Sequence, residues 1–255
     1  MLLAIDIGNS NIVFGVYRGK ELIAHWRVAT EPLRTTDEFA MLLSSLFAHQ
    51  GLGLQEVQGA IIASVVPPLT PVFQELCQRY LARVPLVVGT GIKTGVRIRT
   101  DNPREVGADR VVNALAAHRL YGGPVIVIDF GTATTFDAVS KEGDYLGGAI
   151  APGIDIAAEA LYRRTAKLPR IELVPPPRAI GTNTVHAMQS GLVLGYVGLV
   201  EGLVGRLRLE LGEGTRVVAT GGLATAIAKE TRLIEAVNPQ LTLEGLKMIW
   251  ELNNA

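Results

Sequence analysis

The stretch VIVIDFGTATT, residues 125–135, lies at the midpoint of the chain and decides the fold. The first residues, LLAIDIGNSN at positions 2–11, repeat its pattern. In each copy an apolar run predicts a buried strand, an Asp ends it, and a Gly two residues later allows a sharp turn. Small hydroxyl and amide residues follow at the tip of the turn. Two such tips, one in each half of the chain, predict a cleft between two related domains.

The repeat extends beyond the tips. Second strands are predicted at 12–17 and 136–140, turns at 18–20 and 141–143, and third strands at 22–28 and 145–150. The same meander therefore occurs twice, which indicates a duplicated α/β domain and excludes a solenoid, because only two copies are present. Gly122 and Gly123 end a predicted helix and close the first half. We expect an N-terminal domain at 1–121 and a C-terminal domain at 122–255.

Composition limits the function classes. The chain has 255 residues, 48% hydrophobic and 19% charged, which is enough for two cores. Lys plus Arg equals Asp plus Glu at 24 each, so no overall field attracts nucleic acid or an anionic membrane, and a small-molecule partner is favoured. The single cysteine, Cys77, excludes an internal disulfide, and with no signal-like N-terminus it favours the cytoplasm. Mean hydropathy is +0.30, yet we expect Pro or charge to cut every apolar run before the ~20 residues of a membrane span.

The remaining elements follow from periodicity. A capping box at 35–38 begins a helix that runs to Gly51, and Cys77 falls in a predicted helix at 72–81, where a core role is favoured over a nucleophile. Residues 89–95 mimic a phosphate loop, but Ile92 stands where Gly is required, so a plain loop is expected. The other predictions are strands at 59–66, 84–88 and 96–99, helices from 109, at 155–165 and at 184–211, and a strand plus a short helix at 241–252. Residues 216–223 predict a strand followed by a glycine turn and a helix.

The helix predicted at 184–211 contains five glycines at spacings of three and four residues. Each glycine costs helix stability, so we expect another helix to approach closely there, within the chain or across a dimer; the glycines are Gly191, Gly195, Gly198, Gly202 and Gly205.

The segment TDNPREVGADR, residues 100–110, packs charge around a Pro and a Gly and then enters a helix. Asp109 and Arg110 fall in the first helical turn. By sequence physics alone, an Asp at this position most often stabilises the helix dipole, and an adjacent Arg is most often solvated. The four histidines lie far apart without ligand spacing, so a metal cluster is not expected.

A nucleoside triphosphate would suit the two tips. It needs backbone donors at a Gly turn, hydroxyls or amides near its oxygens, and carboxylates that hold Mg²⁺ directly or through water. Both tips supply this set. A Gly-Gly turn at 221–222, after the last long strand, offers a flat backbone surface for a purine. The ordered series of tip, tip and Gly-Gly turn is more specific than any one of them.

At this point the chain resembles the acetate and sugar kinase, Hsp70 and actin superfamily. Residues 6–11 are similar to its first phosphate motif, 129–134 to its second, and 220–222 to its adenosine motif. More narrowly the chain resembles type III pantothenate kinase over nearly its whole length, on the segments 6–11, 101–110, 129–135, 147–153 and 181–184. The resemblance implies duplicated ribonuclease H-like (actin-like) domains, each a mixed sheet flanked by helices, with an ATP cleft between them.

The resemblance also implies function: ATP-dependent phosphorylation of the terminal hydroxyl of pantothenate to 4'-phosphopantothenate, the first step to coenzyme A, by a cytoplasmic homodimer. It implies that Asp109 is the catalytic base, that Asp129 holds K⁺ or NH₄⁺, and that Asp6 helps to hold Mg²⁺. Thr100 stands where members of the family often have Tyr. The pantothenate residues implied are Thr100, Gly107, Ala108, Asp109, Arg110 and Thr184, and the ATP residues are Asp6, Ile7, Gly8, Asn9, Ser10, Asn11, Ile12, Val13, Thr132, Gly221 and Gly222.

Two alternatives use the same fold. An ATP-binding accessory protein of transcription would need no acceptor base, so residues 107–110 favour the kinase. An ATPase switch of the Hsp70 or actin kind is disfavoured by the short chain, because those proteins carry large additional subdomains.

Overall fold

The computed structural model describes residues 1–254, which form two compact units. The first contains Met1–Val96, Asn102–Ala116 and the segment from Leu241 onward, and the second contains Arg97–Asp101 and Ala117–Gln240. The expected division at residue 121 differs from this in one large respect: the C-terminal helix belongs to the first unit. Its apolar residues are buried there, and the order of residues along the chain does not reveal that return. Ala255, the end of the expected second domain, lies outside the described residues.

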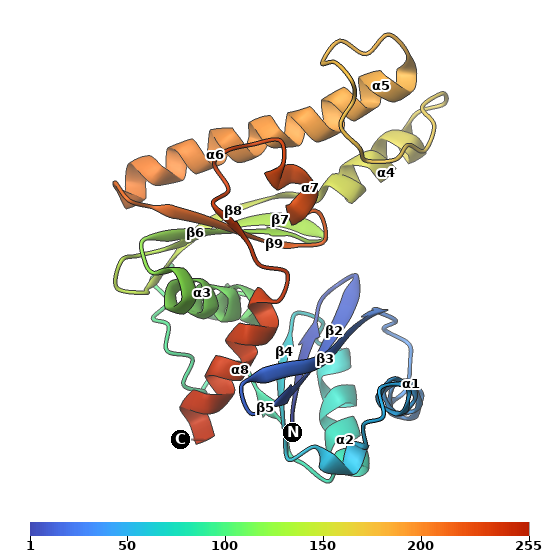
Figure 1. The fold of residues 1–255 in the computed structure, drawn as a ribbon, viewed down its shortest axis with the longest axis vertical. Coiled ribbons are helices and arrows are strands. Elements are labelled where there is room, and N and C mark those ends of the chain that lie inside the picture. The colour runs from blue at the N-terminus through green and yellow to red at the C-terminus, as the bar shows by residue number, and fades with distance from the viewer. Residues whose placement is uncertain (255) are drawn as a thin grey trace. The chain divides into compact units, whose positions relative to one another are not determined.

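The first unit is built on a five-stranded sheet with the order β3-β2-β1-β4-β5. The meander pairs are antiparallel, whereas β1–β4 and β4–β5 are parallel. Figure 1 shows α1 and α2 lying near this sheet and α8 running beside it. The elements are β1 (Leu2–Ile7), β2 (Asn11–Arg18), β3 (Glu21–Ala29), α1 (Thr36–His49), β4 (Gly59–Ser64), α2 (Leu69–Leu81), β5 (Leu86–Val87), the start of α3 (Ala108–Tyr121) and α8 (Leu241–Asn254).

The second unit repeats this arrangement, with the order β8-β7-β6-β9-β10. Again the meander pairs are antiparallel and the two pairs that follow are parallel. The identical order in both units confirms the predicted duplication. The elements are β6 (Val125–Phe130), β7 (Ala133–Val139), β8 (Tyr145–Pro152), α4 (Ile154–Arg164), α5 (Thr184–Gln189), α6 (Gly195–Leu211), β9 (Arg216–Gly221), α7 (Ala224–Ala228) and β10 (Ala236–Val237).

Each sheet has apolar side chains on both faces, which explains the continuous apolar runs of β1, β4 and β6. In the first unit, Phe39 of α1 and Phe73 of α2 pack against Ile5 and Phe14. The opposite face packs against α3 and α8 through Leu115 and Leu246. Cys77 is fully buried in the first of these cores, as predicted.

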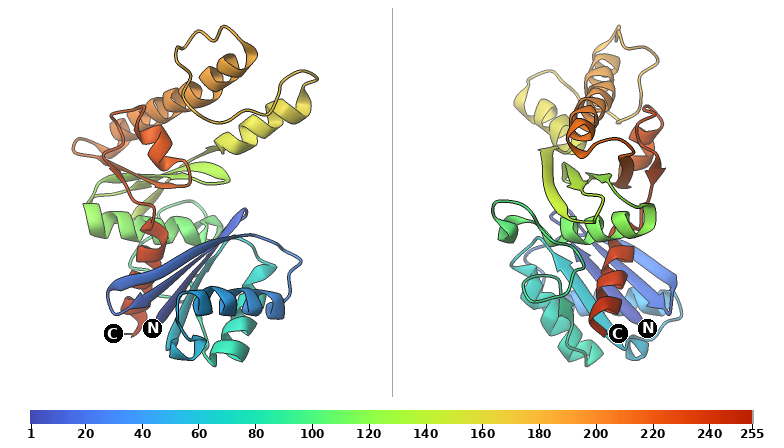
Figure 2. Two further views of the ribbon diagram at one scale, coloured as in Figure 1. Left: turned by 45° about the vertical axis from the view of Figure 1, so that its right-hand side comes forward. Right: turned by 90° about the vertical axis from the view of Figure 1, so that its left-hand side faces the viewer.

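The chain between residues 184 and 211 is one long helical segment, α5 and α6 joined by a π-helical turn at Ser190–Leu194. Figure 2 shows it above the sheet of the second unit, with a loop leading into it from α4. Its buried residues, including Tyr196, Val200 and Val204, pack on β6, β7 and β9. By length and composition it could cross a membrane, although 44% of its most apolar window is buried inside the protein. The expectation that Pro or charge cuts every apolar run was therefore wrong here.

Two further expectations were wrong. Residues 241–252 form one helix without a strand, because the buried positions Leu243, Leu246 and Ile249 follow helical spacing. Residues 96–99 do not form a strand in the described part of the chain. Their strand-like pairing there is an isolated bridge between Ile98 and Tyr145. Along the glycine-rich helix, a Cβ added to Gly191, Gly195, Gly198 or Gly205 would touch none of the described residues, and one on Gly202 would touch only the Arg206 side chain. No helix of the described chain approaches these glycines closely, so the alternative of an approach across a dimer stays a prediction. A close helix approach within the chain occurs at Gly245 of α8, where a Cβ would lie 2.4 Å from the carbonyl oxygen of Val112 in α3.

Candidate functional site

The first tip is a tight turn between β1 and β2, held by hydrogen bonds to the end of β3. The Gly8 N–H donates to the Asn11 carbonyl at 3.0 Å, and the Thr30 hydroxyl donates to the Gly8 carbonyl at 2.6 Å. The Thr30 N–H donates to the Ser10 carbonyl at 3.0 Å. Asn9 and Ser10 are exposed at this tip, and Asp6 is half-buried at the end of β1. The turn therefore presents amide, hydroxyl and carboxylate groups on a fixed backbone.

Not all of residues 6–13 offer side chains at this tip. Ile7 and Ile12 are fully buried in the hydrophobic core. Any contact that these two make with a ligand must come from their backbone. The polar side chains of this segment are those of Asp6, Asn9, Ser10 and Asn11.

The second tip brings together two motifs that are distant in sequence. Asp129 is the penultimate residue of β6 and lies opposite Thr220 of the parallel strand β9. The Gly221 that follows has φ of +91°, and a Cβ there would lie 2.6 Å from Oδ1 of Asp129. Glycine is thus required by both conformation and space. The Gly222 N–H donates to the Phe130 carbonyl at 3.1 Å, which joins the predicted adenosine motif to the second phosphate motif.

The two tips each carry one carboxylate, Asp6 and Asp129. Two glycines lie close to the second of these, since a Cβ on Gly131 would lie 3.6 Å from the same Oδ1 of Asp129. Among residues 1–254, no group of three or more His, Cys, Asp and Glu side chains could hold a metal. Mg²⁺ commonly binds through one or two carboxylates together with substrate phosphates and water. Single carboxylates such as Asp6 and Asp129 fit that kind of binding.

Asp109 lies in the first turn of α3, half-buried. The N–H of Arg110 donates to Oδ1 of Asp109 at 2.8 Å. Burial raises the pKa of Asp109, and it outweighs the opposing effects of this hydrogen bond and of the Arg110 charge. The sequence favoured a carboxylate stabilised by the helix dipole, an effect that would lower the pKa instead. Removal of the carboxylate from water makes it the stronger base.

Gly107 makes room for Asp109. A Cβ at Gly107 would lie 2.5 Å from Oδ1 of Asp109 and 3.3 Å from Cγ1 of Val65. Any other residue at 107 would push the carboxylate away from its position. The Asp109 carboxylate can therefore keep this position only if residue 107 is glycine.

Thr100 belongs to a short segment that is attached to the second unit. The carboxylate of Asp144 accepts hydrogen bonds from Nε of Arg97 at 2.8 Å and Nε of Arg99 at 3.0 Å. The main chain of Tyr145 bonds the main chain of the same two arginines. Within the described residues, the Oγ1 of Thr100 is buried and has no hydrogen-bond partner. Buried hydroxyls are rarely left this way, so the atom suits a ligand that completes it.

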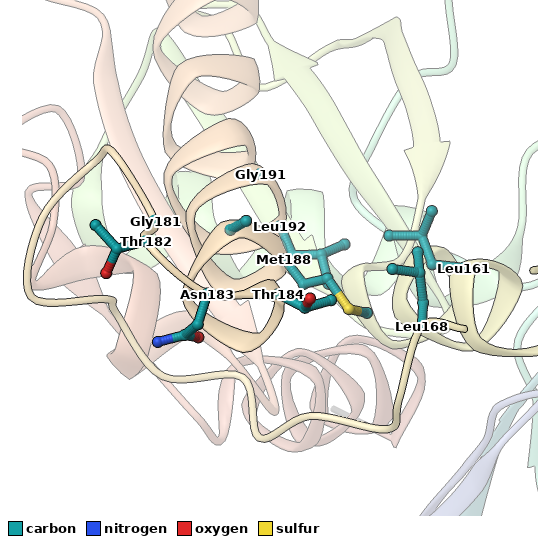
Figure 3. Close-up of a pocket in the computed structure, with 10 residues that line it drawn as sticks. Leu161, Leu168, Gly181, Thr182, Asn183, Thr184, Met188, Gly191 and Leu192 are labelled. Carbon is teal, nitrogen blue, oxygen red and sulfur yellow. The ribbon is translucent and has the colours of Figure 1, made fainter.

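Thr184 begins α5 and lines an open pocket of about 660 Å³. The helix is capped by Asn183, whose side chain accepts the His186 N–H at 2.9 Å. Figure 3 shows Leu161, Leu168 and Met188 on one side of the pocket, with Thr184 beside Met188. The pocket therefore combines an apolar wall with a row of polar groups at 182–184.

Comparison with known proteins agrees with this geometry. The family model described as type III pantothenate kinase matches residues 2–206. A type III pantothenate kinase of Moorella thermoacetica (strain ATCC 39073 / JCM 9320) is 58% identical over 253 residues, which cover 99% of this chain and 100% of that protein.

The chain belongs to the type III pantothenate kinase family.

Two solved structures have a fold similar to that of this chain. A protein of Campylobacter jejuni described as a Baf family transcriptional activator has a TM-score of 0.64 at 20% identity, covering 99% of this chain and 98% of that one. A Sinorhizobium meliloti protein described as a 2-dehydro-3-deoxygalactonokinase has a TM-score of 0.62 at 14% identity, covering 99% and 96%. The likeness at these identities concerns the fold, which is the actin-like fold of sugar kinases.

The structure divides the predicted site residues of this family member between its two units. Residues 6–13 and 107–110 lie in the first unit, and Thr100, Asp129, Thr132, Thr184, Gly221 and Gly222 lie in the second. The sequence did not predict one buried polar pair. The Tyr145 hydroxyl donates a hydrogen bond of 2.8 Å to the Asp137 carboxylate, and both side chains are buried. The available signal was the alternation of Thr135 and Asp137 in a strand, which places both on one face.

Proposed function

We propose that this protein phosphorylates pantothenate with ATP, giving 4'-phosphopantothenate in the first step of coenzyme A synthesis. The observation that carries the proposal is 58% identity to a type III pantothenate kinase along essentially the whole of both chains. The enzyme is a kinase that transfers phosphate to pantothenate.

Asp109 is the proposed base. Its carboxylate would accept the proton of the pantothenate hydroxyl, aided by the burial that raises its pKa. Phosphoryl transfer has a largely dissociative transition state, so alignment of the hydroxyl with the γ-phosphorus matters more than base strength. The hydrogen bond from the Arg110 N–H and the room left by the missing Cβ of Gly107 support that alignment.

The other proposed roles involve residues from both units. Pantothenate would contact residues 107–110 together with Thr100 and Thr184, and the orphaned hydroxyl of Thr100 supports its role. ATP would use residues 6–13, Thr132 and the Gly221–Gly222 turn. Asp6 would hold Mg²⁺, and Asp129 would hold K⁺ or NH₄⁺. Bound cations would neutralise the charge on the transferring phosphoryl oxygens.

We also propose a cytoplasmic homodimer. Supporting it, the glycines at 191, 195, 198 and 205 have no described neighbour on their open side, so α5 and α6 have room for a second copy. Leu substituted for Gly195 would overpack such a contact by roughly 1 to 3 kcal/mol. Light scattering checks this proposal. We expect the wild type to be a dimer and the Gly195→Leu variant to shift toward monomer. A monomeric wild type refutes the assembly.

The decisive experiment is Asp109→Asn in an assay of pantothenate-dependent ADP formation, with saturating Mg-ATP and K⁺. Asn keeps the shape but cannot accept the proton, so kcat should fall by ~10² to 10⁴-fold. A thermal melt confirms that the variant folds. Wild-type turnover in the folded variant removes Asp109 as the base. ADP release by the wild type that does not require pantothenate would point to the ATP-binding regulator instead.

A further inference from the structure

Thr30 is a half-buried residue that the proposed mechanism does not use, although it contacts the first tip twice. It directly follows β3. Its N–H donates to the Ser10 carbonyl at 3.0 Å, and its hydroxyl donates to the Gly8 carbonyl at 2.6 Å. One residue from outside the turn therefore holds two carbonyl oxygens of the turn that joins β1 to β2.

The second unit contains half of this arrangement. In each unit, the residue that follows the third strand donates its N–H to the carbonyl of the residue that precedes the second strand. In the second unit these residues are Gly153 and Thr132, at 3.1 Å. A Cβ on Gly153 would lie 2.2 Å from the Thr132 carbonyl oxygen and 2.7 Å from that of Gly131, so no side chain fits there. The hydroxyl of Thr30 is therefore an addition of the first unit to a contact that both units share.

The first turn is also one residue longer than the second. The Gly8 N–H donates to the carbonyl of Asn11, three residues later, at 3.0 Å. The Gly131 N–H donates to the carbonyl of Ala133, two residues later, at 3.1 Å. A longer turn that begins at glycine has more conformational freedom. The added bond from the Thr30 hydroxyl restricts that freedom.

A held carbonyl sets the direction of the next N–H. In a planar trans peptide the C=O and the N–H point to opposite sides. The hydroxyl bond to the Gly8 carbonyl therefore directs the N–H of Asn9 away from Thr30. The bond to the Ser10 carbonyl does the same for the N–H of Asn11, and both asparagines are exposed. Backbone N–H groups arranged in this way at a turn attract phosphate oxygens.

We propose that Thr30 is a positioning residue of the first tip, whose hydroxyl keeps the peptide between Gly8 and Asn9 turned so that its N–H faces the phosphates of ATP. This inference rests on the proposed binding of ATP at residues 6–13. It adds a residue from outside that segment, and it predicts that the hydroxyl affects the use of ATP and not that of pantothenate.

Thr30→Val removes the hydroxyl but keeps the N–H bond and the branched shape. Hydrogen bonds to charged groups are stronger than neutral ones, so a misdirected N–H should lower kcat/KM for ATP by about tenfold. KM for pantothenate should stay at the wild-type value, and Thr30→Ser should restore kcat/KM for ATP. If valine prevents folding, Thr30→Ala repeats the comparison with a smaller side chain.

A second readout does not depend on turnover. A ligand that binds only the folded protein raises the melting temperature with its concentration. The rise produced by Mg-ATP should require about tenfold more ATP in Thr30→Val than in wild type. The rise produced by pantothenate should be the same in both proteins. An equal loss of both responses would indicate general damage to the fold and would overturn the inference.

Thr215→Val is the matched control. The Thr215 hydroxyl also donates to a glycine carbonyl at 2.6 Å, that of Gly212, but it lies in the second unit between α6 and β9. Valine at this position should leave kcat/KM for ATP unchanged, and a fall equal to that of Thr30→Val would contradict the inference.

Asp6→Asn separates the inference from the function on which it rests. If Asp6→Asn lowers kcat/KM for ATP while folded Thr30→Val keeps the wild-type value, the inference is wrong and the proposed ATP site stands. If Asp6→Asn also keeps the wild-type value, the ATP site at the first tip fails and the inference fails with it.

Discussion

Gly107→Ala tests whether the position of the Asp109 carboxylate controls turnover. The added Cβ would lie 2.5 Å from Oδ1 of Asp109, whereas ordinary contact begins near 3.4 Å, so the carboxylate must move by about 0.9 Å. A side chain can make that shift by rotation, so the loss of folding stability should be small. A displacement of about 1 Å at a reacting group can reduce the rate by ~10²-fold.

The assay compares kcat for pantothenate-dependent ADP formation in wild type, Gly107→Ala and the control Gly89→Ala. Gly89 lies in a loop of the same unit, and a Cβ there touches none of the described residues within 4 Å. We expect kcat of Gly107→Ala to fall by about two orders of magnitude, with melting temperatures within a few degrees of each other. If folded Gly107→Ala keeps wild-type kcat, the argument that this glycine places the carboxylate is refuted.

Three more predictions follow from charge and burial. Asp144→Asn should raise KM for pantothenate more than it lowers kcat, because the Asp144 carboxylate holds the segment that carries Thr100; an unchanged KM would contradict this. Burial raises the pKa of Cys77 to about 12, so at pH 8 only roughly one thiol in 10⁴ is ionised, and a thiol reagent should label it only after unfolding. Since the folded-state pKa of Asp109 is raised, its charged form lowers stability at neutral pH, and this cost disappears as the pH falls below the unfolded pKa; Asp109→Asn should therefore melt above wild type at pH 7 and converge with it in acid.

The sequence predicted the duplicated fold because the repeat is local. Each copy of strand, Asp and Gly turn can be recognised within about ten residues. The turn at Gly8 and the strand that contains Asp129 occur where the pattern predicts them. The return of α8 to the first unit depends on packing between residues far apart in the chain. No local pattern carries that information, and so the expected division differed from the observed units.

The chemistry of single groups was harder to predict than their location. Asp109 was expected in the first turn of a helix and lies there, but its raised pKa depends on neighbours that bury it. Close helix packing was expected at the glycines of the long helix, within the chain or across a dimer, and within the chain it occurs at Gly245. Spacing shows that glycine permits an approach, but only the folded arrangement shows which glycine is used. The partnership of Asp137 with Thr135 and Tyr145 depends on strand register in the same way.

The divided first unit has a consequence for synthesis of the chain on the ribosome. Its continuous part ends at Val96, and its closing helix begins at Leu241. At a translation rate of about 5 to 20 residues per second, the intervening 144 residues, 97–240, take roughly 7 to 29 seconds. During that interval one face of the N-terminal sheet lacks Leu243, Leu246 and Ile249, which later cover it. The C-terminal unit, complete at Gln240, can mature first, so the half of the enzyme that is made first is finished last.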